Sequence, residues 1–203
     1  MSKSLFAITE WITKFAILNI IWMLFSALGL ILFGFFPATV AMFAVIRKWL
    51  TGYTNIPVFK YFWKIYKKEF WKANLIGVIV TAVALIVYVD FYYIQANTEL
   101  SSLFIHIPLY LFIFAFMLTL LYLFPVYVHY DVTFFQVFKN ALLIMFIHPI
   151  HNIGLIASIA ITYLVMSYIP GLAFFFGGSF IAYLIMGTCY NAFQRIDRKK
   201  RTN

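Results

Sequence analysis

Acidic side chains are scarce in this sequence, and none of them lies in the middle of a long apolar stretch. The 203 residues contain six Asp or Glu against fifteen Lys or Arg, which gives a net charge of +9. Three of the acids, Asp90, Glu99 and Asp131, border connections between apolar stretches. Proton-driven carriers usually bury a carboxylate within the membrane, so the sequence argues against classical proton coupling and leaves facilitated passage open.

Cysteine and catalytic motifs are equally scarce. The single cysteine, Cys189, lies inside an apolar run, which excludes an intrachain disulfide. The sequence contains no P-loop, no glycine-rich nucleotide fingerprint, no Ser-His-Asp set and no H-E-x-x-H motif. We therefore expect a protein that is not an enzyme and that holds no cofactor.

Apolar residues take the place of charge. Hydrophobic residues make up 65% of the chain and charged residues 10%, whereas a soluble domain has roughly 25% charged residues. We predict an all-α, polytopic membrane protein that forms a single domain over residues 1–203. No small-residue cleavage site ends the first apolar run before Phe36, so we do not expect a cleaved signal peptide. The basic residues cluster at the ends of apolar runs, which indicates topology and not nucleic-acid binding.

Five stretches are long enough to cross a bilayer, which takes about 20 apolar residues. They are Phe15–Phe36, Leu75–Ile94, Leu103–Val128, Ile153–Ile169 and Leu172–Phe193. Only Pro170-Gly171 separates the last two, which predicts a tight helical hairpin.

Basic residues are distributed unequally between the connections. Seven Lys or Arg lie from Arg47 to Lys72, one is Lys139, and five lie in the basic tail, residues 195–203. The connections Gln95–Ser102 and Pro170-Gly171 hold none. Since basic segments stay in the cytoplasm during insertion, we predict a protein of the plasma membrane with a cytoplasmic C-terminus.

Two paths are open to the chain near Pro37. Either the first span continues through Pro37 as one long kinked helix with the N-terminus outside, or Pro37 opens a short returning helix, Ala38–Ile46. Nine residues at 1.5 Å each reach about 14 Å, half a bilayer, so the second path would be re-entrant. We expect the kinked helix, although Lys3 and Lys14 favour an N-terminus inside.

A short internal similarity suggests a duplication of residues 15–94 and 103–169. Phe36-Pro37 and Phe124-Pro125 each end a span and precede an amphipathic stretch and a new span. The similarity extends to phenylalanines at a constant offset, Phe59, Phe62 and Phe70 against Phe135, Phe138 and Phe146. We predict a weak parallel repeat. Chance is the alternative, because the match is short and Phe is abundant.

The segment Phe59–Lys72 separates aromatic from basic side chains on a helical wheel. One face is aromatic, and the other carries Lys60, Lys64, Lys67, Lys68 and Lys72. We expect an interfacial helix along the inner surface, with its aromatic face at the acyl boundary and its lysines on anionic headgroups of membrane lipids. The alternatives are that the lysines only fix topology, or that they dock an acidic partner protein.

A few polar residues in or near the spans are further candidates. Asn19 and His106 lie within spans, where they either make interhelical hydrogen bonds or line a substrate path. The spacing of His148 and His151, next to Asn152, could point two imidazoles at one metal. A zinc site needs a further ligand, and no Cys or carboxylate is nearby, so we expect histidines at the mouth of the fourth span and no metal.

Several segments resemble the YesL-like family of small bacterial membrane proteins. The segments Asn19–Phe25, Gly34–Trp49 and Ile56–Trp63 resemble that family's first span and elbow. The segments Tyr130–Phe135 and Lys139–Leu143 are similar to its second elbow. The resemblance covers nearly the whole chain and supplies no catalytic residues.

Members of that family lack an assigned biochemical function and are often encoded beside carbohydrate-uptake systems. The resemblance therefore implies a supporting role in carbohydrate utilisation, which is an association and not a site. The leading hypothesis is a non-enzymatic accessory protein that binds a carbohydrate transporter component or its regulator through the elbows and the basic tail. The alternative is a small carrier or channel in its own right, with Pro37 and Pro125 flanking a path. The oligomeric state is open.

Overall fold

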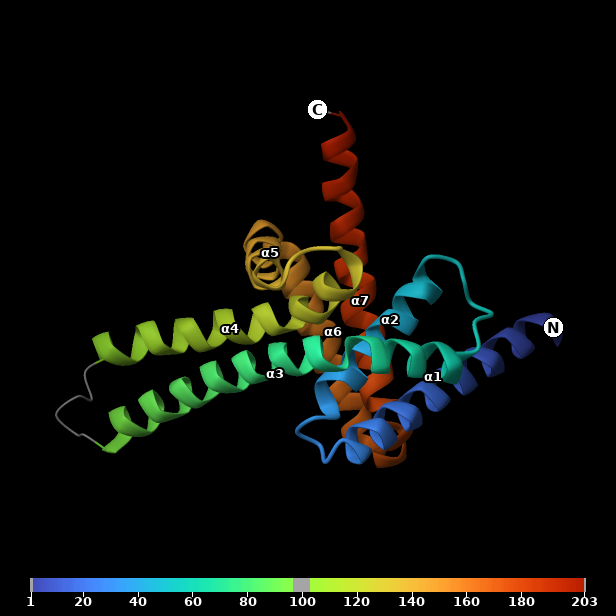
Figure 1. The fold of residues 1–203 in the computed structure, drawn as a ribbon, viewed down its shortest axis with the longest axis horizontal. Helices are drawn as coiled ribbons and strands as arrows, with labels where there is room; N and C mark the ends of the chain where they lie inside the picture. The colour runs from blue at the N-terminus through green and yellow to red at the C-terminus, as the bar shows by residue number, and fades with distance from the viewer. Residues whose placement is uncertain (1, 97–102, 203) are drawn as a thin grey trace.

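The computed structural model describes the backbone of residues 2–96 and 103–202, and it contains seven helices and no strands in those ranges (Figure 1). The helices are α1 (Ser2–Leu28), α2 (Phe35–Leu50), α3 (Val58–Ala96), α4 (Leu103–His129), α5 (Phe134–Ile147), α6 (Pro149–Tyr168) and α7 (Pro170–Thr202). Side chains are described for residues 5–95 and 106–195. Residues 97–102 of the predicted outer connection, and the side chains of the basic tail beyond Arg195, lie outside these ranges.

Five of the described helices are long and apolar enough to cross a membrane, which confirms the polytopic all-α prediction. The membrane-length segments are Leu5–Leu28, Val58–Gln95, His106–His129, Pro149–Tyr168 and Pro170–Arg195. Ile169 alone separates α6 from α7, and Pro170 is the first residue of α7. Proline at that position lacks only an N–H that has no partner in the first turn of a helix.

The kinked first helix is a wrong prediction, because the chain breaks before Pro37. α1 ends at Leu28, and a tight turn between Gly29 and Gly34 leads into α2. A Cβ on Gly29 would lie 2.3 Å from the Gly34 backbone, so this turn has no space for a side chain there. Pro37 is the third residue of α2, where a missing N–H is tolerated. The alternative helix, Ala38–Ile46, is also too short, since it lies within a helix of 16 residues.

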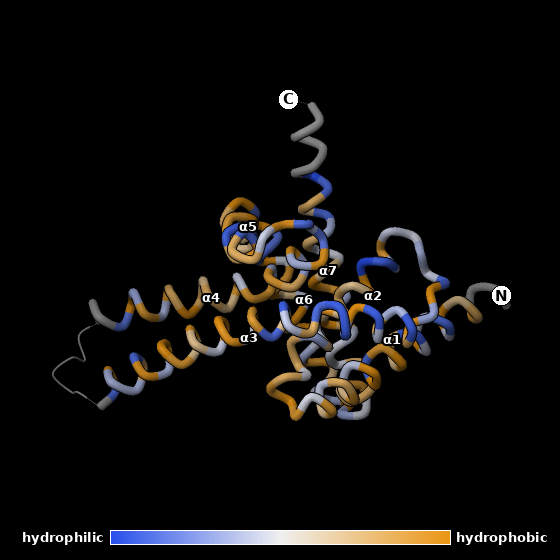
Figure 2. The backbone as a smooth tube through the Cα atoms, viewed as in Figure 1, coloured by the Kyte–Doolittle hydropathy of each residue, from blue (hydrophilic) through white to orange (hydrophobic). Residues whose placement is uncertain are grey.

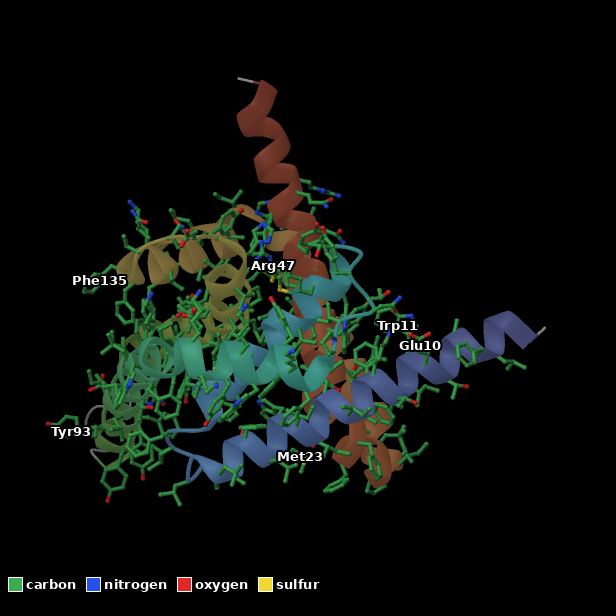
Figure 3. All side chains as sticks on the ribbon, turned by 45° about the vertical axis from the view of Figure 1, so that its right-hand side comes forward. Glu10, Trp11, Met23, Arg47, Tyr93 and Phe135 are labelled. Carbon is green, nitrogen blue, oxygen red and sulfur yellow. The ribbon has the colours of Figure 1, made fainter. Side chains whose placement is uncertain are left out.

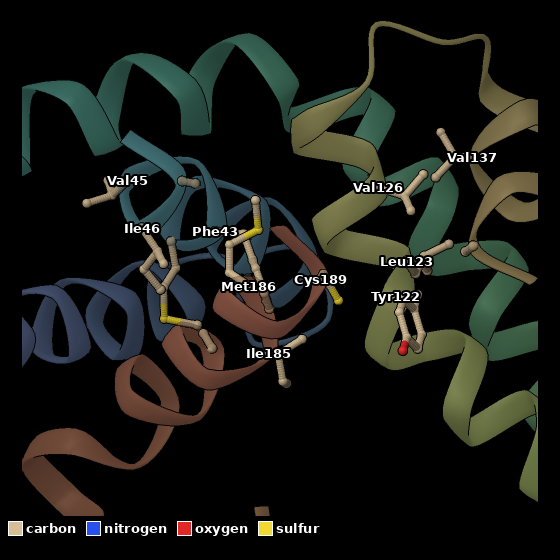
Figure 4. Close-up of a cluster of buried hydrophobic side chains, with 14 of the residues drawn as sticks. Phe43, Val45, Ile46, Tyr122, Leu123, Val126, Val137, Ile185, Met186 and Cys189 are labelled. Carbon is tan, nitrogen blue, oxygen red and sulfur yellow. The ribbon is translucent and has the colours of Figure 1, made fainter. Parts of the chain in front are cut away.

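α2 forms the centre of the molecule. Every residue from Pro37 to Ile46 is buried, and so is Trp49. A helix that is apolar on all sides has to be covered on all sides, and α2 packs against α1, α3, α4 and α7. Figure 4 shows Phe43 and Ile46 of α2 beside Met186 of α7 in the core.

α3 approaches α2 closely at a glycine. A Cβ on Gly77 would lie 2.3 Å from the ring of Phe36. α3 is a single helix of 39 residues, about 58 Å long at 1.5 Å per residue. The basic segment Phe59–Lys72 therefore continues into the second span instead of ending before it. The second elbow differs, because α5 is a separate short apolar helix.

The second half of α3 and the first half of α4 form an arm that projects from the other helices (Figure 1). The arm is largely apolar (Figure 2), and its side chains are mostly exposed, among them Val78, Leu85, Tyr92, Leu111 and Phe114. In a membrane this surface is covered by lipid or by another apolar helix.

The predicted aromatic face of Phe59–Lys72 is turned largely toward protein. Phe62 and Tyr66 are buried, and their ring centroids lie 5.4 and 5.1 Å from that of Phe25 in α1. Phe59 and Trp63 are exposed. The prediction of an acyl-facing aromatic surface is therefore wrong for Phe62 and Tyr66. Helical periodicity identifies an apolar face without telling whether lipid or protein covers it.

The two Phe-Pro dipeptides of the predicted repeat lie next to each other in the fold. The ring centroids of Phe36 and Phe124 are 6.4 Å apart. Phe36-Pro37 begins α2, whereas Phe124-Pro125 lies within α4. The duplication stays a prediction.

The reversal at α2 leads us to expect an N-terminus on the cytoplasmic side. α2 runs back from the end of α1 (Figure 1), and its 16 residues measure about 24 Å, close to the roughly 30 Å of a bilayer core. If α2 also crosses the bilayer, it adds a sixth crossing to those of the five long helices. Both termini then lie on the same side of the membrane. A green fluorescent protein fused to the N-terminus should then fluoresce, and alkaline phosphatase fused there should be inactive.

A phosphatase fused after Gln95, at the far end of α3, is the matched control and should be active. An active phosphatase at the N-terminus, with the control also active, would restore the external N-terminus.

Candidate functional site

A cavity of about 760 Å³ with a mixed polar and apolar lining opens between α2, α3 and the end of α4. Its charged side chains come from three segments that are distant in the sequence. The cations are Arg47, Lys48, Lys68 and Lys72, and the carboxylates are Glu69 and Asp131. We call this space the basic cavity.

Arg47 is held in place by the end of α4. Its Nη1 donates to the carbonyl oxygen of Val128 at 2.8 Å. The last carbonyls of a helix have no partner within the helix, and a cation is favourable at that end. The Nε of Arg47 is buried and has no hydrogen-bond partner among the described residues. Arg47 is half-buried, and Figure 3 shows it where several helices converge.

Glu69 has partners at both carboxylate oxygens. The hydroxyl of Tyr127 donates to its Oε2 at 2.6 Å, which joins α4 to α3. The Nζ of Lys68 lies 3.3 Å from its Oε1. The Glu69 side chain is only 15% exposed, so these contacts compensate a carboxylate that is mostly removed from water.

The other cations of the cavity form no ion pair among the described residues. Lys48 Nζ lies 4.9 Å above the ring of Tyr53. Lys72 is exposed at the rim, as is Asp131. The cavity is therefore positive overall, since its lining holds four cations and two carboxylates, and Lys68 and Glu69 pair with each other.

The predicted lysine face divides into two groups. Lys68 and Lys72 line the basic cavity, whereas Lys60, Lys64 and Lys67 do not. These three are exposed on the outside of α3. Lys67 Nζ lies 4.9 Å above the ring of Trp63.

The sequence interpretation missed Arg47, Lys48 and Tyr127 as members of this site. In the sequence, Arg47 and Lys48 indicate only topology, since they lie at the end of an apolar run. Their place in the cavity depends on the reversal of the chain at α2. Tyr127 lies 58 residues from Glu69, and no local pattern connects the two.

Asn19 joins α1 to α7. Its Nδ2 donates to the carbonyl of Phe174 at 2.7 Å, and its Oδ1 accepts from the backbone N–H groups of Gly178 and Ser179, both at 2.9 Å. In a regular α-helix the N–H of Gly178 donates directly to the carbonyl of Phe174, four residues earlier. The side-chain amide of Asn19 bridges these two backbone groups of α7.

His106 lies elsewhere, in the first half of α4. Its ring centroid is 6.1 Å from that of Tyr110 in the same helix. Neither Asn19 nor His106 lines the basic cavity. Neither residue is therefore part of this site.

The histidine pair and Asn152 have different environments. The ring centroids of His148 and His151 are 5.2 Å apart. Within the described parts of the chain no three metal-binding side chains come together. Asn152 is buried, accepts from the hydroxyl of Tyr122 at 2.6 Å and donates to the carbonyl of Met145 at 2.9 Å, which links α4, α5 and α6.

A second hollow is apolar. It measures about 650 Å³ and lies between α1, α6 and α7, with Trp11, Phe15 and Phe176 among its lining residues. Thr162 contributes a hydroxyl, but this donates to the carbonyl of Ser158 in its own helix. The side chains that line this hollow can contact hydrocarbon, and they offer no catalytic group.

The chain is similar in sequence to known proteins over almost its full length. Residues 15–91 match a family model described as "Protein of unknown function, DUF624". The chain is 35% identical over 189 residues to "Uncharacterized protein YteU" of Bacillus subtilis (strain 168), a match that covers 93% of this chain and 85% of the relative.

Two further relatives come from the same organism. "Uncharacterized protein YesV" is 34% identical over 197 residues, which cover 97% of this chain and 95% of the relative. "Uncharacterized protein YesL" is 36% identical over 194 residues, which cover 94% and 90%. No solved structure matches the chain.

Proposed function

This chain belongs to the DUF624 family of proteins of unknown function, and we propose that it is a non-enzymatic accessory protein of the plasma membrane. In this proposal it binds a carbohydrate transporter component, or its regulator, on the cytoplasmic side. The partner would be recognised through an acidic surface, because the face that we assign to the cytoplasm is basic.

The observation that carries the proposal is the gathering of basic helix ends on one side of the molecule. The loops that follow α2 and α4 lie toward the side from which the end of α7 projects (Figures 1 and 3). α7 has 33 residues and measures about 50 Å, more than the roughly 30 Å of a bilayer core. A helix that leaves the membrane with five Lys or Arg in its last nine residues suits docking to an acidic partner.

The geometry gives less support to a carrier. A carrier needs polar groups that face a shared path. Asn19 is instead engaged with α7, and His106 lies near Tyr110 of its own helix. The half-buried carboxylate Glu69 is engaged with Tyr127 and Lys68.

The exposed lysines of α3 that lie outside the cavity fit contact with lipid. Lys60, Lys64 and Lys67 lie outside the basic cavity, where they would meet anionic headgroups, each with about 1 kcal/mol of attraction. We propose this contact as an aid to orientation and not as the function itself.

Gene deletion tests the role of the protein in carbohydrate use. Deleting the gene should impair growth on one complex carbohydrate and leave growth on glucose unchanged.

Crosslinking in native membranes tests the partner. Mild crosslinking of the full chain should capture a subunit of a carbohydrate transporter or its regulator. Replacing Arg198, Lys199, Lys200 and Arg201 by Gln should weaken that crosslink several-fold, because long-range attraction depends on the charge.

The control is the triple variant of Lys60, Lys64 and Lys67 to Gln, which also loses charge on the basic side and should keep the crosslink. A saturable sugar flux through the purified protein in liposomes would contradict the accessory role and favour the carrier. An identical crosslink in the tail variant would contradict docking through α7.

A further inference from the structure

Arg47 is a cation held in place by one hydrogen bond, and its guanidinium can donate further hydrogen bonds. One guanidinium nitrogen, Nη1, is occupied by the carbonyl of Val128, and Nε is buried without a hydrogen-bond partner in the described part of the chain. A guanidinium has five N–H donors and no acceptor, so the group calls for further oxygen ligands. A buried donor that lacks a partner is unfavourable and is normally explained by a water, an ion or a ligand.

The surroundings of Arg47 select for an anion with more than one charge. Lys48, Lys68 and Lys72 converge on the same space from α2 and α3. Glu69 is paired with Lys68 and accepts from Tyr127, so Lys48 and Lys72 are the lysines of the cavity that form no ion pair among the described residues. The planar fork of an arginine together with lysines is a characteristic arrangement for phosphate recognition.

The cavity is too large for a bare phosphate alone. Its volume of about 760 Å³ lies in the range of roughly 300–1,000 Å³ typical of small-molecule sites. Tyr53 and Tyr61 contribute hydroxyl groups to the lining, and Val40, Ala44 and Leu75 contribute apolar surface. Such a mixed lining suits a phosphate that carries a small polyol.

We propose that the basic cavity binds a phosphate group that is esterified to a small polyol. Two sources supply this chemistry, namely the glycerophosphate headgroup of an anionic phospholipid and a soluble polyol or sugar phosphate. Arg47 holds the phosphate at the end of α4, and Lys68 and Lys72 close the rim. This site is independent of the accessory role, which depends on the projecting end of α7.

Variants on the same helix separate the cavity from general surface charge. The cavity variant is Lys68→Gln with Lys72→Gln. The control variant is Lys60→Gln with Lys64→Gln, which removes the same charge from α3 outside the cavity. All four lysines are exposed, so both variants should fold. Arg47→Lys is a third variant, because it keeps the charge and loses the fork.

The experiment uses the full-length protein in nanodiscs of neutral phosphatidylcholine. Inorganic phosphate and glycerol 3-phosphate are titrated, and thermal stabilisation reports binding. In a parallel arm the discs contain phosphatidylglycerol, and native mass spectrometry counts retained lipid. Wild type and control should bind saturably in at least one arm, and the cavity variant should bind about tenfold more weakly, since two charge-assisted contacts are lost.

The outcomes divide clearly. Stabilisation by glycerol 3-phosphate without selective retention of phosphatidylglycerol identifies a soluble ligand, and the reverse identifies a lipid headgroup; both support the site. Absence of saturable binding in both arms overturns it. An equal loss in the cavity and control variants also overturns it, because the charge would then act from the surface of α3 and not from the cavity.

Discussion

Replacing Asn19 by leucine should lower the free energy of unfolding by about 3 kcal/mol. The substitution removes three hydrogen bonds between α1 and the backbone of α7. An interhelical hydrogen bond in a membrane protein contributes about 0.6 kcal/mol on average and up to about 1.7 kcal/mol. Here the loss is larger than that average, because buried backbone groups of α7 lose their partners. Equilibrium unfolding of the purified protein in mixed micelles measures the difference.

Asn74→Leu is the matched control for this prediction. Asn74 also lies in an apolar helix, but its Nδ2 donates to the carbonyl of Phe70 in the same helix. Its replacement should change stability by less than about 1 kcal/mol. If the two variants lose the same stability, or if Asn19→Leu is as stable as wild type, Asn19 does not hold α1 against α7.

Phe62→Ala should be destabilising by about 3–5 kcal/mol, because a fully buried aromatic ring leaves a cavity when it is removed. The ring packs on Phe25 of α1, so the variant should loosen the contact between α1 and α3. Thermal unfolding followed by tryptophan fluorescence gives the measurement.

Phe59→Ala tests whether burial or aromatic character decides the effect. Phe59 lies on the same face of α3, three residues away, and is 58% exposed. We expect it to lose less than about 1 kcal/mol. A loss as large as that of Phe62→Ala would mean that this face is covered by protein along its whole length, for example by a second copy of the chain.

The spans were predictable because hydrocarbon thickness dictates their length. The predicted third span, Leu103–Val128, agrees with α4 within one residue. The predicted break between the last two spans is also present, since α6 ends at Tyr168 and α7 begins at Pro170. The sequence offers α2 only as the shorter alternative Ala38–Ile46, which is not the expected path because it falls short of the length of a span; the observed helix has 16 residues. A helix wrapped by protein has no need to match the membrane by itself, so the length rule does not detect it.

The candidate site was predictable only in part, for a related reason. The lysines of α3 form a pattern within one helix, and periodicity detects such patterns. Arg47 reaches Val128 across 81 residues, and Tyr127 reaches Glu69 across 58. These contacts depend on how helices pack, and no local spacing encodes them. Asn19 likewise could be recognised as a polar group in need of a partner, but α7 could not be named as that partner.

The central position of α2 has a consequence for how the protein is made. α2 is synthesised early, yet α4 and α7, which cover two of its sides, follow much later in the chain. Before α4 is made, Arg47 lacks the carbonyl of Val128 as a partner. Before α7 is made, the side of α2 that faces Met186 borders lipid or the insertion machinery. The last helix therefore closes the structure. Nascent chains that stop before it should be the form that membrane proteases recognise and degrade.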